Sequence, residues 1–171
     1  MSGLFLRVPL AALALCLAGC GANYTWRSSV PDRCRSVTVS TFRNESSLSE
    51  LGAVATRQIA RELQREGTFR LRSAKDAALE IQGVVKSISS TGKGYSRLVG
   101  EMMSVRDLQA VVEVSVVDRQ ERKVLVNARQ YVAQAKMTVL SDETTGLRDT
   151  SGRLMEDLAR QVVDDLLNFK W

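Results

Sequence analysis

The sequence predicts an α+β fold: a two-layer sandwich in which a mixed, mostly antiparallel sheet carries two amphipathic helices on one face. Between residues 77 and 137, three segments alternate apolar with polar side chains, as strands with one buried face do. One helix-like segment precedes them and another follows, each with a single apolar stripe. Each stripe needs a covering surface, and one face of a sheet is able to cover both.

The first twenty residues have the features of an export signal. Residues 8–17 form an apolar run of ten residues behind Arg7, shorter than the roughly 20 that a membrane span requires. The run leads into Leu17-Ala18-Gly19-Cys20, which resembles a bacterial lipobox. The resemblance implies cleavage before Cys20 and a covalent N-acyl diacylglycerol on that cysteine, and Gly21 implies export to the outer membrane. An ordinary signal peptide with an unrelated cysteine is the alternative.

We therefore predict three parts: a lipoprotein signal peptide over residues 1–19, a lipidated tether over 20–35 and a single domain over 36–171. The mature chain of 152 residues is long enough to bury one core of its own. Cys16 leaves with the signal and Cys20 is acylated, so Cys34 is the one remaining thiol. A buried or unreactive Cys34 is favoured over a bond to a partner chain.

The helices and strands are expected in the following order. Residues 36–42 alternate valines and form a strand, and residues 48–66 form a helix with a capping box from Ser47 to Glu50 and with Gly67 at its end. A short strand or an edge segment is expected at 69–72, and a longer strand at 77–89. The glycine-rich residues 89–104 lack periodicity and suggest a long hairpin loop.

Two more strands and a helix complete the expected domain. Strands are predicted over 105–118 and 124–137, joined by a charged turn, and a final helix begins near 145 or 150 and ends near 168. In the last strand one face is expected to carry Val124, Val126, Ala128 and Val132, and the solvated or partner-facing side Asn127, Arg129 and Tyr131.

No catalytic centre is predicted, and the protein is expected not to be an enzyme. The chain has no histidine, and its three cysteines form no C-x-x-C pair, which excludes the common general base and the usual zinc and redox motifs. Residues 90–93 match S-x-x-K by letter but lie in a predicted loop without the companion motifs of that enzyme class. We expect neither a metal nor a cofactor apart from the covalent lipid.

Basic residues offer the more informative signals. Arg57, Arg61 and Arg65 recur every four residues and form either a solvated helix face or a site for an anionic partner. The segment with Lys93 and Arg97 mixes cations with leucine and methionine, which suits an amphiphile with an anionic head, unless it is simply a polar loop. Nucleic acid is not an expected partner for a chain anchored outside the cytoplasm.

Several short patterns together resemble the LptE family. They are the lipobox, the short tether with Tyr24, Val37-x-Val39-x-x-Phe42-x-Asn44, the capped helix, Asp76-Ala77-x-Leu79-x-x-x-Gly83-x-Val85, two long strands and a C-terminal helix followed by Trp171. The resemblance implies an outer-membrane lipoprotein on the periplasmic side that plugs and helps assemble an LptD β-barrel and binds lipopolysaccharide. It also implies basic side chains near strand tips for the lipid phosphates, and the fitting positions are Lys93, Arg97 and Lys136.

A second resemblance leads to a different function. The first two strand patterns also resemble periplasmic lipoproteins of the CsgG and LpoB kind, which implies regulation of a secretion pore or of a peptidoglycan synthase. LptE is favoured because two long consecutive strands are followed by one helix near the end of the sequence. The chain also contains only two prolines, whereas LpoB-like activators carry a long proline-rich linker.

Overall fold

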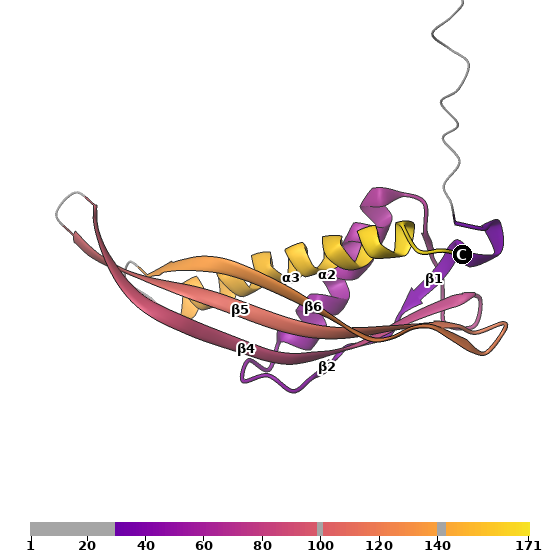
Figure 1. Cartoon of the computed structure of the whole chain (residues 1–171), viewed down its shortest axis with the longest axis horizontal. Helices are drawn as coiled ribbons and strands as arrows, with labels where there is room; N and C mark the ends of the chain where they lie inside the picture. Colours follow the sequence, from indigo (N-terminus) through magenta and orange to yellow (C-terminus); the bar gives the residue numbers. More distant parts are fainter. Residues whose placement is uncertain (1–29, 99–100, 140–142) are drawn as a thin grey trace, which may run out of the picture.

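The computed structural model describes residues 30–98, 101–139 and 143–171, and it describes side chains for all of these except 93–98, 101–104, 138–139 and 143–144. Its elements are η1 (Asp32–Cys34), β1 (Ser36–Val39), β2 (Arg43–Asn44), α2 (Leu51–Glu66), β3 (Arg70–Leu71), β4 (Leu79–Leu98), β5 (Glu101–Asp118), β6 (Lys123–Val139) and α3 (Glu143–Leu167). Both helices lie on the same side of a long curved sheet (Figure 1). The predicted two-layer α+β sandwich is confirmed.

The six strands form one mixed sheet in the order β3-β1-β4-β5-β6, with β2 paired to β4 beyond β1. β1 runs parallel to β3 and β4, whereas β4, β5 and β6 form an antiparallel meander. β1 and β2 pair with β4 only between Leu79 and Val85. Residues 87–98 of β4, 101–111 of β5 and 132–139 of β6 therefore extend past the parallel strands, and we call this region the hairpin end (Figure 1).

The core lies between the sheet and the helices. Alternate residues of β5 are buried on the helix side, as a pleated strand with one covered face requires. The apolar stripes of both helices pack against them. The buried residues of these three elements are Leu108, Ala110, Val112, Val114 and Val116 of β5, Leu51, Ala55, Ile59 and Leu63 of α2, and Leu154, Leu158, Val162 and Leu166 of α3. The side of the meander turned away from the helices is called the open face.

Phe42 explains why two of the short sequence patterns occur together. Its side chain is 3% exposed and lies over Gly83 of β4. A Cβ atom at residue 83 would stand 2.0 Å from Cε1 of Phe42, and one at residue 52 would stand 2.5 Å from the Phe42 carbonyl oxygen. The phenylalanine of the first pattern therefore requires the glycine of the second, and it also brings the start of α2 close to the sheet.

Helix α2 begins later and by another mechanism than predicted. Its N-cap residue is Glu50, which makes no side-chain capping bond, so the predicted capping box is wrong. Asn44 orders the approach instead: its amide donates to the Leu48 carbonyl at 2.6 Å and its side-chain oxygen accepts from the Ser46 N–H at 3.0 Å. The other end is as predicted, because Gly67 has φ 86° and its N–H bonds the Leu63 carbonyl.

The predicted loop over residues 89–104 is also wrong, because β4 continues to Leu98 and β5 begins at Glu101. The glycines that suggested a loop coincide with an irregularity in the strand. The register shifts between Thr91 and Gly94, and Gly92 within that interval has φ 80°. A bulge of this kind accepts a glycine without ending the ladder, and backbone pairing does not depend on apolar alternation.

The faces predicted for the last strand are wrong beyond residue 128. Ala128 has φ 44°, and its backbone N–H bonds the Ser115 hydroxyl at 2.9 Å. This bulge reverses the alternation of β6, so Tyr131 is buried at 8% exposure whereas Val132 is 42% exposed. Side chains expected on the solvated side therefore face the helix layer.

Residues before β1 also contribute to the packed fold. Val30 and Cys34 are each 2% exposed and belong to the core cluster. Val30 is the first described residue, and the beginning of the described chain lies at the end of the molecule opposite the hairpin end, on the side of the C-terminus (Figure 1).

Candidate functional site

The three basic residues expected to bind a lipid phosphate come from neighbouring strands at the hairpin end. Lys93 lies in the register shift of β4, two residues after Thr91, and Arg97 pairs with Met102 of β5. Asp107 of β5 pairs with Thr91 on one side and with Lys136 of β6 on the other. Two strand spacings separate Thr91 from Lys136, about 10 Å. The side chains of Lys93 and Arg97 lie outside the described residues.

Lys136 lies on the open face. Its neighbour Met137 is 1% exposed and packs on the helix side, so the pleat turns Lys136 the other way. The Lys136 side chain is exposed and forms no ion pair with any described residue, although Asp107 is its partner in the register. An exposed ammonium without a carboxylate partner is available to an incoming anion.

A polar hollow of about 370 Å³ lies on the open face, nearer the parallel strands. Its walls carry hydroxyl, amide and charged groups from the residues between β1 and β2, from β2 itself and from β4 and β5. The polar lining residues are Ser40, Thr41, Arg43, Gln82, Glu113 and Ser115. Gln130 donates to the Glu113 carboxylate at 3.0 Å, which holds one side of the hollow in place. Groups of this kind can hydrogen-bond a polar ligand, beside Gly83, Val84 and Ala128, which complete the lining.

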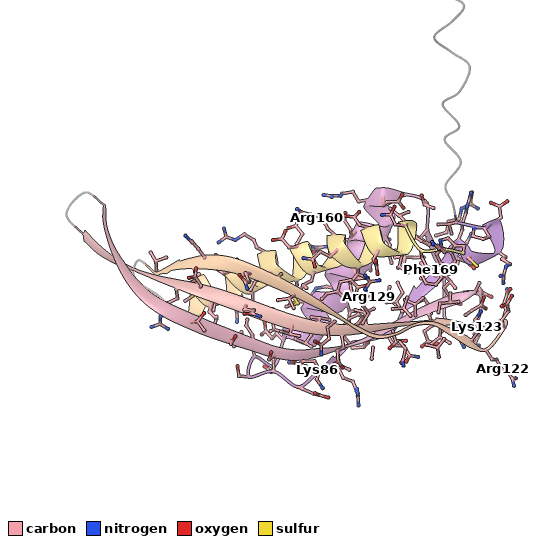
Figure 2. All side chains as sticks on the ribbon, viewed as in Figure 1. Lys86, Arg122, Lys123, Arg129, Arg160 and Phe169 are labelled. Atoms are coloured by element: carbon pink, nitrogen blue, oxygen red, sulfur yellow. The ribbon has the colours of Figure 1, made fainter. Side chains whose placement is uncertain are left out.

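On the helix side, a polar cluster joins β6 to α3. The Tyr131 hydroxyl donates to the Asp165 carboxylate at 2.7 Å, and the Arg129 guanidinium pairs with the same oxygen at 2.7 Å. Burial and the neighbouring carboxylate raise the pKa of Tyr131, so its hydroxyl stays protonated. Arg129 lies beside α3 (Figure 2). Sequence reasoning missed this cluster because nothing in the sequence marks Ala128 as the point where the alternation reverses.

The predicted lipidation residue, Cys20, lies outside the described residues, so its acylation stays a prediction. Cys34 is buried, as one of the favoured interpretations had it, and burial raises the pKa of its thiol. A buried, protonated thiol is a poor nucleophile. On α2, Arg57, Arg61 and Arg65 are all exposed, and Arg65 pairs with Glu62 at 2.9 Å.

The described residues contain no constellation suited to catalysis. Ser90 to Lys93 form part of a strand and do not begin a helix, so the S-x-x-K match lacks its structural context. Within residues 30–98, 101–139 and 143–171, no three His, Cys, Asp or Glu side chains gather closely enough to hold a metal ion. Over the same part of the chain, neither helix has the length and apolarity to cross a membrane.

Comparisons with known proteins identify both a family and a fold. The family model LptE, described as lipopolysaccharide-assembly, matches residues 34–168. No curated protein matches the chain. A solved protein from Xanthomonas campestris has 8% identity and a TM-score of 0.57, covering 85% of this chain and 88% of its own. An uncharacterized lipoprotein B from Nitrosomonas europaea has 12% identity and a TM-score of 0.51, covering 87% and 92%. At such identities these two structures indicate the fold alone.

Proposed function

Because the chain belongs to the LptE lipopolysaccharide-assembly family, we propose that it is an outer-membrane lipoprotein that binds lipopolysaccharide and plugs and helps assemble an LptD-type β-barrel. The family match over residues 34–168 is the observation that carries the proposal. The family consists of non-enzymatic assembly lipoproteins, which agrees with the prediction that this protein is not an enzyme. In this proposal the lipid on Cys20 holds the domain at the periplasmic face of the outer membrane.

Lipopolysaccharide binding is assigned to the hairpin end. Lys93, Arg97 and Lys136 come from strands that lie within two positions of one another in the sheet. Lys136 is exposed and has no described ion-pair partner, so binding a phosphate there breaks no existing salt bridge. Lipid A carries phosphate groups beside acyl chains, and charge-assisted hydrogen bonds to phosphate are among the stronger polar contacts.

The binding test compares two sets of charge removals. Changing Lys93, Arg97 and Lys136 together to glutamine is expected to weaken lipopolysaccharide binding by about tenfold at low salt, since each exposed pair contributes up to roughly 1 kcal/mol. The loss shrinks as salt rises, because exposed charges are then screened. The matched control changes Arg57 and Arg61, which are exposed on α2 and form no ion pair with a described residue, to glutamine. Equal losses in both variants would remove the hairpin end from the proposal.

The partner is tested separately by crosslinking and copurification from outer membranes. Recovery of a large β-barrel with the lipidated chain supports the plug and assembly role. Recovery of a peptidoglycan synthase, or of a homo-oligomeric pore, would instead favour the alternative regulatory function implied by the CsgG and LpoB resemblance. If the protein binds lipopolysaccharide fully but no β-barrel is recovered with it, the proposed lipopolysaccharide binding stands and the proposed role as a barrel plug is overturned.

A further inference from the structure

The positive charge of the chain is concentrated at one end of the molecule. Residues 30–35, 70–76 and 118–123 together carry eight basic and four acidic side chains, a net charge of +4. All other residues from 30 to 171 carry 14 basic and 15 acidic side chains, a net charge of −1. We call these three segments the tether end, because Val30, the residue nearest to the predicted lipid anchor, belongs to them.

Tertiary contacts hold the three segments together. Arg33 binds Asp118 at 3.3 Å and Glu121 at 2.6 Å, which joins η1 to the turn between β5 and β6. The backbone N–H of Arg119 bonds the Ala78 carbonyl at 2.8 Å, and its guanidinium bonds the carbonyl of Ala74. The Arg70 N–H bonds the Arg35 carbonyl at 2.7 Å. The three segments that carry these cations therefore lie together at one end of the molecule, although they are far apart in the sequence.

Five of these cations are exposed and form no salt bridge with any described residue. They are Arg70, Arg72, Lys75, Arg122 and Lys123. Figure 2 places Arg122 and Lys123 at the extreme end of the meander, on the side of the molecule where the C-terminus lies. The acids of the tether end are engaged: Asp118 and Glu121 with Arg33, Asp32 with Arg35 at 3.1 Å, and Asp76 with the Ser73 hydroxyl. The uncompensated charge at this surface is thus positive.

The tether limits how far this surface can stand from the membrane. Only nine residues, 21–29, separate Cys20 from Val30. A fully extended chain covers at most about 3.6 Å per residue, so ten steps span no more than about 36 Å. A lipid on Cys20 therefore keeps Val30, where the tether end begins, within that distance of the bilayer, whereas the hairpin end lies at the opposite end of the sheet (Figure 1).

We infer that the tether end is a second, electrostatic membrane contact that docks on anionic phospholipid headgroups beside the acyl anchor. The inference rests on the proposed lipidation of Cys20 but not on lipopolysaccharide binding. Basic side chains near an anionic membrane surface each favour binding by about fivefold, and a basic patch beside an acyl chain is a recognised combination of membrane signals. The contact orients the domain, with the tether end on the headgroups and the hairpin end away from them.

The test uses the lipidated full-length protein in vesicles of phosphatidylcholine alone or of equal parts phosphatidylcholine and phosphatidylglycerol. A fluorophore is placed at Gln120→Cys in the tether end, and separately at Gln134→Cys on β6; both positions are exposed, and Cys34 is buried against labelling. Quenching by headgroup-labelled lipid reports which end touches the bilayer. We expect strong quenching at residue 120 in the anionic vesicles, its loss at high salt and in neutral vesicles, and weak quenching at residue 134 throughout.

Charge variants give the decisive control. Arg122→Gln with Lys123→Gln should lower the ratio of docked to undocked protein by about tenfold or more, whereas Arg57→Gln with Arg61→Gln on α2 should leave it unchanged. Equal quenching of residue 120 in neutral and anionic vesicles would overturn the inference, as would displacement of residue 120 by added lipopolysaccharide, which would make the patch a lipopolysaccharide site. The mass of the acyl groups on Cys20, measured on the same sample, tests the anchor independently.

Discussion

Arg33 at the tether end reaches Asp118 and Glu121 across 85 and 88 residues of sequence, whereas at the hairpin end each strand pairs with its neighbour along the chain. The tether end therefore exists only when η1, β3 and the turn between β5 and β6 have all reached their places. The hairpin end needs only a meander and the helix that covers it. Tertiary contacts between distant segments bring together the basic residues of the tether end, whereas the basic residues of the hairpin end lie on strands that follow one another along the chain.

Substitutions at two glycines of β4 have the largest expected effects. They compare the part of β4 beside the short parallel strands with the part at the hairpin end. Gly83→Ala should lower the free energy of unfolding by about 3 kcal/mol, because the new Cβ meets the buried Phe42 ring and overpacks the core. Gly92→Ala should lower it by about 1 kcal/mol, because only the positive φ is strained and the new Cβ would stand 3.8 Å from its nearest neighbour, an Asp107 carboxylate oxygen. Urea denaturation measures both values. Similar losses would mean that both parts of β4 are packed equally tightly.

Arg33 and Arg122 test whether the tether end depends on its long-range ion pairs. Arg33→Ala should lower the free energy of unfolding by about 2 kcal/mol, because it leaves the buried Asp118 carboxylate, 3% exposed, without its charged partner. Arg122→Ala should change it by less than about 0.5 kcal/mol, because Arg122 is exposed and has no described ion pair. If the two variants unfold at the same denaturant concentration, the tether end does not depend on the long-range ion pairs of Arg33.

Tyr131→Phe should lower the free energy of unfolding by about 1 kcal/mol at neutral pH, because it removes one buried hydrogen bond to Asp165. The pKa of Tyr131 is raised in the folded state above its ordinary value of 10.0. The associated stability is thus fully present below pH 10 and is lost as the pH rises above it, because the unfolded chain then ionises first. Thermal unfolding across alkaline pH should show a shallower decline for the variant than for the parent protein.

Much of the fold followed from the sequence where the signal was local. The stripe of α2, its end at Gly67 and the alternation of β5 each lie within one segment, and all three were predicted. The failures occurred where distant residues decide the outcome. Asn44 replaces the capping box at the start of α2, and the bulge at Ala128 turns Tyr131 toward Asp165, 34 residues away.

The two candidate sites also differ in how much of each could be predicted from the sequence. Lys93 and Arg97 stand four residues apart, so their grouping is visible in the sequence, and Lys136 was named only through the family resemblance. The cations of the tether end come from three separate segments. The turn containing Arg122 and Lys123 was recognised as charged, but its proximity to Arg72 and Lys75 depends on the hydrogen bonds of Arg119, which no sequence pattern encodes.

The parallel pairing of β1 with β4 has a consequence for the order in which the sheet forms. Val37 aligns with Leu79, 42 residues later, so β1 has no partner on that side until β4 has reached its place. Parallel pairing of distant segments is slow because a long loop must close first. A chain of this topology therefore completes the parallel half of its sheet late, only when β4 returns to the strand that comes first in the described chain.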